Sequence, residues 1–214
     1  MKKSFVLFVA LAVAGTLAAA GARAQAFGQY SGATTLGMNT RLFGAYGSFT
    51  RSESELLAQL RLSFYPNVDF GFQGGLSRVS VLDRSRTSIK VGGDFKGMVV
   101  HRGDAAPFDL SLGAALGVSS AEDFNLLSIG PQAVASRTFG SPGRANVTPY
   151  VGALLLFTRS DLNNANDTDV SVPLRFGAEY APNPDIRLVL ELGVAVSDRI
   201  NDDLKLTVGA NFPF

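Results

Sequence analysis

The chain ends with the stretch LKLTVGANFPF, which runs from Leu204 to Phe214. Apolar residues occupy every second position of this stretch, and polar or small residues fill most of the positions between them. An alternation with a period of two predicts a β-strand that has one wholly apolar face. The ends of soluble domains are usually polar and poorly ordered, so we expect a terminal strand of this kind to complete a larger sheet.

The same alternation recurs along the rest of the chain. It is clearest from Ile186 to Ser197, where every second residue is Ile, Leu or Val. No segment after residue 33 shows the period of a helix, and turn residues separate the alternating segments. The segment Gln25–Ala33 is expected to be a short polar lead-in. Ten strands are predicted: Thr34–Ser48, Glu55–Tyr65, Val68–Val79, Ser88–Val100, Phe108–Ser119, Phe124–Thr138, Val147–Thr158, Asp169–Tyr180, Ile186–Ser197 and Asp203–Phe214.

Two classes of protein contain strands with one apolar face. A soluble β-sandwich or barrel turns that face into its core, whereas a transmembrane barrel turns it outward to lipid. The other face distinguishes them, because here it is rich in Gly, Ala and Ser, which suit a crowded lumen. The strands also have the ~9–11 residues that a tilted strand needs to cross a bilayer. We therefore predict an all-β fold, a closed, transmembrane, antiparallel up-and-down β-barrel of about ten strands, with eight strands as the alternative.

The first residues have the three parts of a secretory signal peptide. Lys2 and Lys3 precede an apolar run, and Ala22-Arg23-Ala24 provides small residues at a cleavage site. We predict residues 1–24 as a cleaved signal peptide and residues 25–214 as a single barrel domain, in preference to a retained membrane anchor. The chain contains no cysteine and has a formal net charge of +1. Disulfides are therefore excluded, and a nucleic acid partner, which favours a basic surface, is not expected.

The connections between the strands give the expected orientation. If the N-terminus lies in the periplasm, the even-numbered links face the periplasm, and all four of them contain proline, which fixes tight turns. The odd-numbered links are rich in Ser, Asp, Asn and Arg and would face the outside. An even number of strands then places both termini in the periplasm.

With these features the chain resembles the small bacterial outer-membrane β-barrels of the OmpA-, OmpX- and OmpW-like class. The resemblance covers nearly the whole exported chain, and its most specific part is the terminal strand, with Phe214, Phe212, Ala210 and Val208 at alternate positions. In that class this pattern is the signal that the outer-membrane assembly machinery recognises. The resemblance implies a location in the outer membrane, contact with its lipid and lipopolysaccharide, and a monomer.

The strand pattern also places charged side chains inside the barrel. Isolated charges in so narrow a space would be costly, so we expect them to pair. Paired charges can close the lumen or can line a polar pore. A barrel of about eight strands is already filled by side chains and ten strands add little room, which favours a closed lumen. The predicted lumen network consists of Arg41, Arg61, Asp69, Lys90, Asp94, Lys96, Asp109, Arg175, Glu179, Arg187, Glu191 and Lys205.

Residues that support catalysis are scarce in this sequence. The only histidine is His101, in the stretch VVHRGD, and its own strand offers no evident nucleophile. The stretch Asp161–Asp169 is rich in oxygen ligands, but it lacks the glycine and the final glutamate of an EF-hand calcium loop, so a hydrated outer loop is expected. We expect no catalytic residue, no cofactor and no metal.

These observations predict a non-catalytic outer-membrane barrel with a charge-filled lumen and a structural or surface-interaction role. The alternative is a narrow porin-like channel for ions or small solutes. A lipid-acting outer-membrane enzyme is the third interpretation, and it would depend on His101 as its only candidate base.

Overall fold

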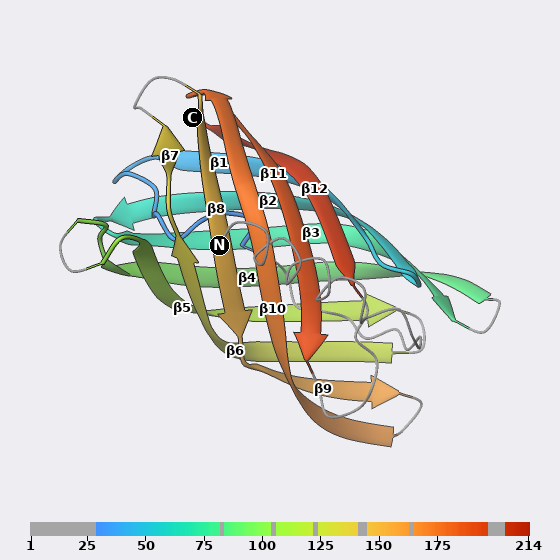
Figure 1. Cartoon of the computed structure of the whole chain (residues 1–214). Coiled ribbons are helices and arrows are strands. Elements are labelled where there is room, and N and C mark those ends of the chain that lie inside the picture. The colour runs from blue at the N-terminus through green and yellow to red at the C-terminus, as the bar shows by residue number, and fades with distance from the viewer. Residues whose placement is uncertain are drawn as a thin grey trace, which may run out of the picture.

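The fold is a closed antiparallel β-barrel (Figure 1). Its wall has ten strand positions, which we call staves, and one of them is shared by two short strands. The computed structural model describes residues 29–81, 84–103, 106–121, 124–140, 145–162, 165–196 and 204–214. The predicted all-β class, closure and count of about ten strands are confirmed, and the alternative of eight strands is wrong. The predicted signal peptide lies outside the described residues. The strands are β1 (Arg41–Phe49), β2 (Glu53–Tyr65), β3 (Val68–Val81), β4 (Arg84–Val100), β5 (Asp109–Ala121), β6 (Phe124–Ser136), β7 (Phe139–Gly140), β8 (Asn146–Leu154), β9 (Leu156–Leu162), β10 (Ala165–Asn183), β11 (Ile186–Val196) and β12 (Lys205–Pro213).

Each stave pairs with its neighbours along the chain, and β12 pairs with β1 to close the barrel. Just beyond this seam, Arg41 and Phe214 exchange two backbone hydrogen bonds. Arg41 N donates to Phe214 O at 3.1 Å, and Phe214 N donates to Arg41 O at 2.9 Å. The strand that ends the sequence is therefore one side of the closing seam.

One stave is built from two strands, β8 and β9, which both pair with β6 and β10 and are separated only by Leu155. Opposite this break, Pro131 has no N–H to donate to the ladder, but its carbonyl accepts a hydrogen bond from Leu155 N at 3.0 Å. A Cβ at Gly130 would lie 1.7 Å from the Leu155 carbonyl oxygen, so only glycine fits there. β7 is a two-residue addition that pairs with β8.

The barrel has two rims. The terminal rim carries Arg41 and Phe214 together with the turns at residues 66–67 and 184–185. The hairpin rim carries the strand ends at Phe49, Val81, Ala121 and Leu162. The first strand therefore begins and the last strand ends at the terminal rim.

The strands reach further at the hairpin rim than the sequence predicts. The stretch Asp161–Asp169 was expected to form a hydrated loop, but β9 continues to Leu162 and β10 begins at Ala165, so this expectation is wrong. The two strands pair from Leu162 and Ala165 back to Leu156 and Ser171. The polar composition of this stretch correctly indicates exposure to solvent, because Asp161 is exposed. It does not indicate an irregular backbone, because Asp161 lies in β9.

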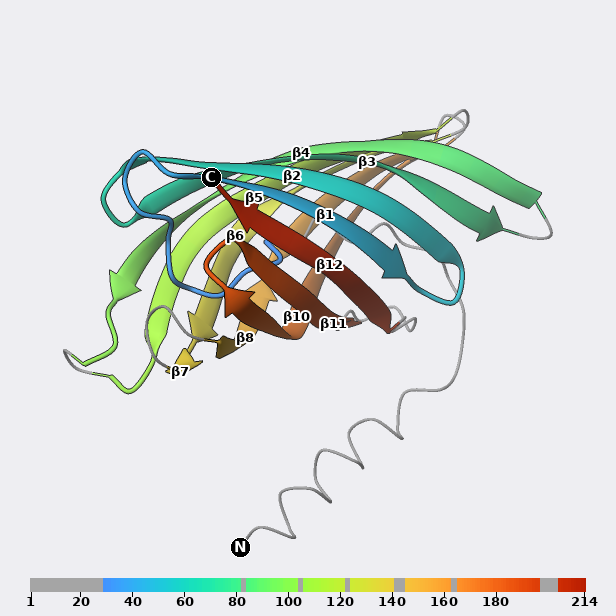
Figure 2. The same ribbon diagram turned by 90° about the horizontal axis from the view of Figure 1, so that it is seen from above.

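The predicted start of the first strand is also wrong. β1 begins at Arg41 and not at Thr34. The preceding residues leave the wall, and Figure 2 shows them in blue inside the curve of the strands. Residues 29–33 are buried, although they belong to no strand.

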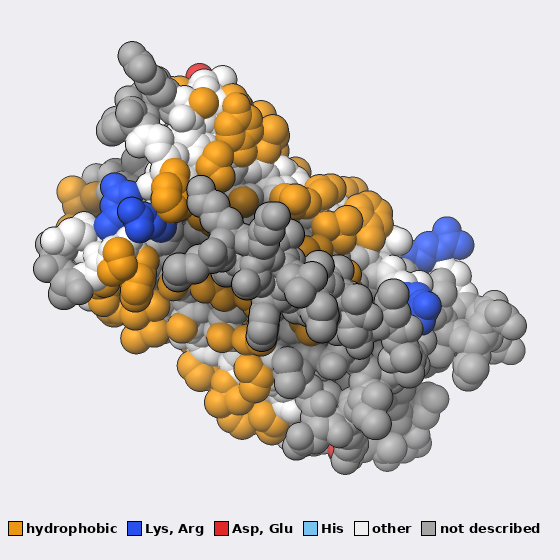
Figure 3. Space-filling view, viewed as in Figure 1, with side chains coloured by type: hydrophobic (Ala, Val, Ile, Leu, Met, Phe, Trp, Pro, Cys, Tyr) orange, Lys and Arg blue, Asp and Glu red, His pale blue; other side chains and the backbone are white. Residues whose placement is uncertain are grey.

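The barrel wall is apolar outside and polar inside. Phe72 and Leu190 are 57% and 54% exposed, whereas the charged Arg61 is 1% exposed. A soluble protein has the opposite arrangement, with large apolar side chains buried and charged side chains mostly exposed. Figure 3 shows hydrophobic side chains gathered over the visible outer surface, with Lys and Arg towards its two ends. Among the described residues, no helix is long and apolar enough to span a membrane.

The seam yields a first prediction. Deleting Phe214 removes both hydrogen bonds to Arg41 and should lower the free energy of unfolding by about 1–3 kcal/mol, since each bond contributes about 0.5–1.5 kcal/mol. Urea titration of the protein refolded into lipid vesicles, followed by heat-modifiable gel migration, measures this change. The control is Phe214→Ala, which keeps both backbone bonds and should fall between the deletion and the wild type. Equal stability of the deletion and the wild type would contradict the assigned role of the seam.

Candidate functional site: the lumen

The interior of the barrel contains most of the charged side chains that the sequence places there. They form a cluster near the terminal rim, a second layer near the hairpin rim and two pairs on the β10–β11 wall. The N-terminal residues lie among them.

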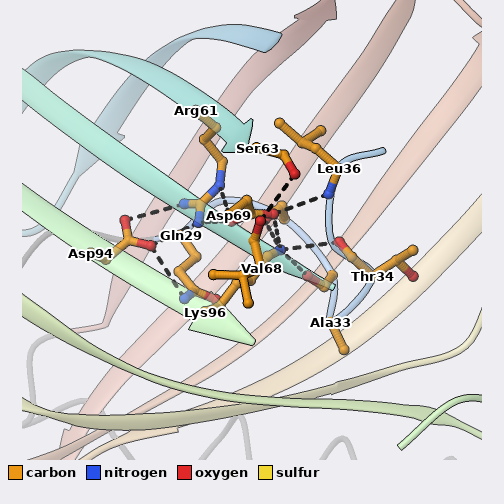
Figure 4. Close-up of polar contacts among 12 residues, drawn as sticks. Gln29, Ala33, Thr34, Leu36, Arg61, Ser63, Val68, Asp69, Asp94 and Lys96 are labelled. Carbon is orange, nitrogen blue, oxygen red and sulfur yellow. Dashed lines mark hydrogen bonds and ion pairs between the residues drawn. The ribbon is translucent and has the colours of Figure 1, made fainter. Parts of the chain in front are cut away.

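The cluster near the terminal rim is centred on Arg61. Its guanidinium lies between two carboxylates: Nη1 and Nη2 donate to Asp94 at 3.1 and 2.8 Å, and Nε donates to Asp69 at 3.1 Å, with a second, shorter contact from Nη2 to Asp69 (Figure 4). Lys96 Nζ lies 3.9 Å from the other Asp69 oxygen. We call Arg61, Asp69, Asp94 and Lys96 the Arg61 cluster.

A glycine makes room for this cluster. A Cβ at Gly71 would lie 2.4 Å from an Asp94 carboxylate oxygen and 2.7 Å from Arg61 Nη1. The fork of the Arg61 guanidinium can therefore lie flat against β3 and meet Asp94 with two parallel bonds, the geometry that makes arginine–carboxylate pairs strong. The small residues on the inner face thus create space for large charged ones.

A second group of charges lies near the hairpin rim, and we call it the hairpin-side layer. Lys90 Nζ bonds Glu53 at 2.7 Å and also contacts Glu55 closely, while Lys205 Nζ lies 2.5 Å from the other Glu55 oxygen. These residues belong to β12, β2 and β4. The hairpin-side layer therefore follows one wall of the barrel.

The opposite wall carries its own pairs. Glu191 accepts a hydrogen bond from the Tyr150 hydroxyl at 2.8 Å and lies 4.0 Å from Arg175. Glu179 lies 3.9 Å from Arg187, which is 38% exposed at the terminal rim. These pairs lie along the β10–β11 wall, and the N-terminal residues lie between this wall and Lys96 on the other side.

Residues 29–36, which we call the N-terminal segment, lie across the lumen. On one side, Lys96 Nζ donates to the carbonyls of Gly32 and Thr34 at 2.7 and 3.2 Å and to Ser31 Oγ at 3.0 Å. On the other side, Gly32 N donates to Glu179 Oε1 at 2.6 Å. The wall of the lumen thus binds the segment mainly through its backbone.

Further contacts hold both ends of the N-terminal segment. Ala33 N donates to Ser136 Oγ on β6 at 2.8 Å, and Leu36 N donates to Asp69 Oδ2 on β3 at 3.1 Å. Gln29 Nε2 reaches Asp94 Oδ1 at 3.4 Å. Staves from both halves of the barrel therefore contact this one segment.

The N-terminal segment also bridges the closing seam from the inside. The Tyr30 ring packs on the Tyr46 ring of β1, with centroids 4.2 Å apart, and the Tyr30 carbonyl accepts a hydrogen bond from Asn211 of β12 at 2.9 Å. The Tyr46 hydroxyl in turn contacts Asn211. Tyr46 can lie flat because Gly44 beneath it has no Cβ, which would lie 2.0 Å from the hydroxyl.

A cavity of about 320 Å³ lies at the terminal rim beside the N-terminal segment. Thr34 of the segment and Thr148, Glu179 and Arg187 of the wall line it. The lining is rich in hydroxyl and charged groups, so the cavity suits water or a small polar solute.

The structure places the predicted network residues as follows. Arg61, Asp69, Asp94, Lys96, Lys90, Lys205, Arg175, Glu179, Glu191 and Arg187 point inward and take part in ion pairs. Asp109 is half-buried at the terminal rim, where it accepts a hydrogen bond from Arg102 N at 2.8 Å. Arg41 was placed inward from the sequence, but it is exposed on the outer face with Phe43, so this placement is wrong.

Two parts of the site were missed. Glu53 and Glu55 share the inward face of β2 with Arg61, and the alternation that placed Arg61 inside could have placed them there too. The N-terminal segment carried no such signal. The sequence predicts its first part as a polar lead-in and its last part as strand.

The candidate residues for other chemistry lie apart from the lumen network. His101 directly follows β4 at the terminal rim and is half-buried. Asp161 forms an exposed pair with Arg159 at 3.6 Å. Within the described ranges, no group of three or more His, Cys, Asp or Glu side chains could hold a metal ion.

Several solved structures of outer-membrane proteins are similar to this chain. The N-terminal barrel domain of OprF from Pseudomonas aeruginosa is 13% identical, with a TM-score of 0.43 over 84% of this chain and 100% of that one. An outer-membrane channel from Pseudomonas putida F1 is 10% identical, with a TM-score of 0.48 over 85% and 98% of the two chains. The β domain of the Bordetella autotransporter BrkA is 13% identical, with a TM-score of 0.47 over 82% and 98%. Neither a protein-family model nor a curated protein matches the sequence.

The Arg61 cluster yields a second prediction. Arg61→Met leaves Asp69 and Asp94 without their shared cation in a buried site, and losing one partner of a buried ion pair costs about 3–5 kcal/mol. The free energy of unfolding in lipid vesicles should fall by about that amount. The matched control is Arg159→Met, which removes an exposed pair and should change stability by less than about 1 kcal/mol. Similar losses in both variants would contradict the assigned role of the cluster.

Proposed function

We propose that this chain is an integral outer-membrane β-barrel with a sealed lumen and a structural or surface-interaction role. The observation that carries the proposal is the N-terminal segment, which crosses the lumen and binds wall strands on both sides of it. The proposal includes no catalytic residue, cofactor or metal.

The outer surface of the barrel supports a membrane location. Exposed apolar patches on soluble monomers rarely exceed a few hundred Å², whereas here exposed apolar residues recur on the outer face of strand after strand, including Phe72, Leu112, Ile129 and Leu190. A closed barrel satisfies every backbone group internally, which a bilayer requires. Acyl chains and lipopolysaccharide would therefore surround this face.

The two rims support the same orientation that the sequence suggested. The terminal rim, where the first strand begins and the last strand ends, would face the periplasm, and the hairpin rim would face the outside. In this arrangement Phe214, Phe212, Ala210 and Val208 form the recognition strand for the outer-membrane assembly machinery, and the seam they complete with β1 closes a monomeric barrel.

The interior supports a sealed lumen. Buried charges on the wall are paired, and the backbone of the N-terminal segment occupies the space between the walls. A narrow porin-like channel is the second candidate. The polar cavity beside the segment at the terminal rim favours it, because that cavity could admit a small solute as far as Thr34 and Glu179.

Conductance tests the sealed lumen. The mature protein refolded in detergent and inserted into a planar bilayer in molar potassium chloride should show no steady openings, because the N-terminal segment and the paired charges exclude a continuous water path. A typical open porin provides the positive control for insertion. Steady unitary conductance from the wild type would overturn the sealed-lumen proposal and support the channel.

The lipid-facing surface gives a separate prediction. Leu190→Arg places a charge on the outer face near the middle of β11 and should cost about 2–4 kcal/mol of stability in lipid vesicles. The control is Ile186→Arg, on the same face at the end of the same strand, where the cost should be about 0–1 kcal/mol. A neutral result for Leu190→Arg would mean that this face does not contact lipid.

A further inference from the structure

We propose that the N-terminal segment is a displaceable plug, and that the barrel passes ions and small polar solutes when the segment leaves the lumen. This inference rests on the proposed sealed state and adds a second, open state to it. It is carried by how the segment is bound and by what remains on the wall without it.

The first argument is that the wall holds the N-terminal segment mostly through its backbone. Lys96 binds the carbonyls of Gly32 and Thr34, while Glu179 and Ser136 bind the N–H groups of Gly32 and Ala33. Such contacts are hydrogen bonds to single charged or polar side chains. Water can replace each of these hydrogen bonds when the segment withdraws. The Tyr30 ring must in addition leave its apolar contact with Tyr46.

The second argument is that the charges which hold the segment have alternative partners on the wall. Lys96 Nζ lies 3.9 Å from Asp69, and Glu179 lies 3.9 Å from Arg187. When the segment leaves, a small side-chain movement lets each charge form a direct pair. The penalty for leaving an unpaired charge in the lumen is therefore avoided in both states.

The third argument is geometric. The N-terminal segment joins β1 through a turn at residues 37–40, which is fixed at the terminal rim because Asn39 N donates to Ser63 O at 2.9 Å. The segment is joined to the wall at this rim and hydrogen-bonds to the β1–β12 seam through its Tyr30 carbonyl, so withdrawal towards this rim does not require the seam to open. Asn39 has a φ of 63°, and Thr40 N bonds Gly37 O at 3.1 Å, which makes a tight pivot.

The fourth argument concerns the space that withdrawal leaves. An extended chain with its side chains occupies roughly 5 Å by 10 Å in cross-section, which is wide enough for water molecules and for partly dehydrated small ions. Within the described part of the chain, the ion pairs of the hairpin-side layer join β12, β2 and β4 along one wall. That layer therefore narrows the lumen from one side. The N-terminal segment, in contrast, reaches from Lys96 on one side of the lumen to Glu179 on the other.

The opening variant is Lys96→Met with Glu179→Gln, which removes charged contacts on both sides of the segment. A hydrogen bond to a charged group shifts an equilibrium by roughly tenfold or more, so the open fraction in a planar bilayer should rise roughly a hundredfold. The matched control is Lys90→Met with Glu53→Gln, which makes the same chemical changes in the hairpin-side layer. It should stay closed.

A reversible lock makes the test specific to the N-terminal segment. The chain has no cysteine, and a Cβ at Gly32 would lie 3.1 Å from Ser136 Cβ, slightly under the ~3.5–4.5 Å of a disulfide. Adding Gly32→Cys and Ser136→Cys to the opening variant should abolish the openings under oxidation and restore them on reduction. The single variant Gly32→Cys provides a second readout, because a water-soluble maleimide should label it slowly with wild-type Lys96 and Glu179 and quickly in the opening variant.

The outcomes separate the two proposals. Steady conductance of the wild type would overturn the sealed state. A folded opening variant that stays closed, equal opening by the control, or openings unaffected by the lock would each overturn the displaceable plug and leave the sealed barrel intact. If the opening variant does not fold, the labelling rate of Gly32→Cys in Lys96→Met alone decides, and an unchanged rate would overturn the plug.

Discussion

The structure depends on the pairing of charges that the barrel encloses. Arg61 is buried inside a ring of strands whose outer face is apolar, so water cannot solvate it from outside. Two carboxylates, Asp69 and Asp94, accept hydrogen bonds from its guanidinium, and Lys96 balances the second negative charge. The wall has to supply small residues such as Gly71 where these groups meet. The glycine at position 71 follows from this requirement.

The same requirement explains why two sets of charges behave differently. In the hairpin-side layer, Lys90 pairs with Glu53 and Glu55, and Lys205 pairs with Glu55, so each of these four side chains has an ion partner among the other three. Near the terminal rim, Lys96 and Glu179 have their wall partners slightly too far away for direct contact. The backbone of the N-terminal segment lies between these charges and bonds both Lys96 and Glu179. The pairing of charges in this half of the lumen therefore depends on whether the segment is present.

The sequence predicted the wall of the barrel well, because alternation records which face of a strand meets lipid. From Ile186 to Val196 the apolar positions are unbroken, and Glu191 between them is inside. The rule failed for β1, where Leu42 and Tyr46 face the lumen while Phe43 and Phe49 face outward. Both faces of that strand are apolar, so alternation cannot decide between them, and Arg41 was assigned to the wrong side.

The N-terminal segment was beyond prediction for a different physical reason. Its partners bind carbonyl and N–H groups, which every residue except proline offers in the same way, so the segment needs no side-chain pattern to be recognised. The longest of these contacts in sequence joins Tyr30 to Asn211, 181 residues away. The wall alone carries a sign of this recognition, because Lys96 and Glu179 lie 3.9 Å from their ion partners Asp69 and Arg187, at the outer limit of an ion pair. Incompletely paired lumen charges are therefore the feature of a barrel sequence that would indicate an internal segment.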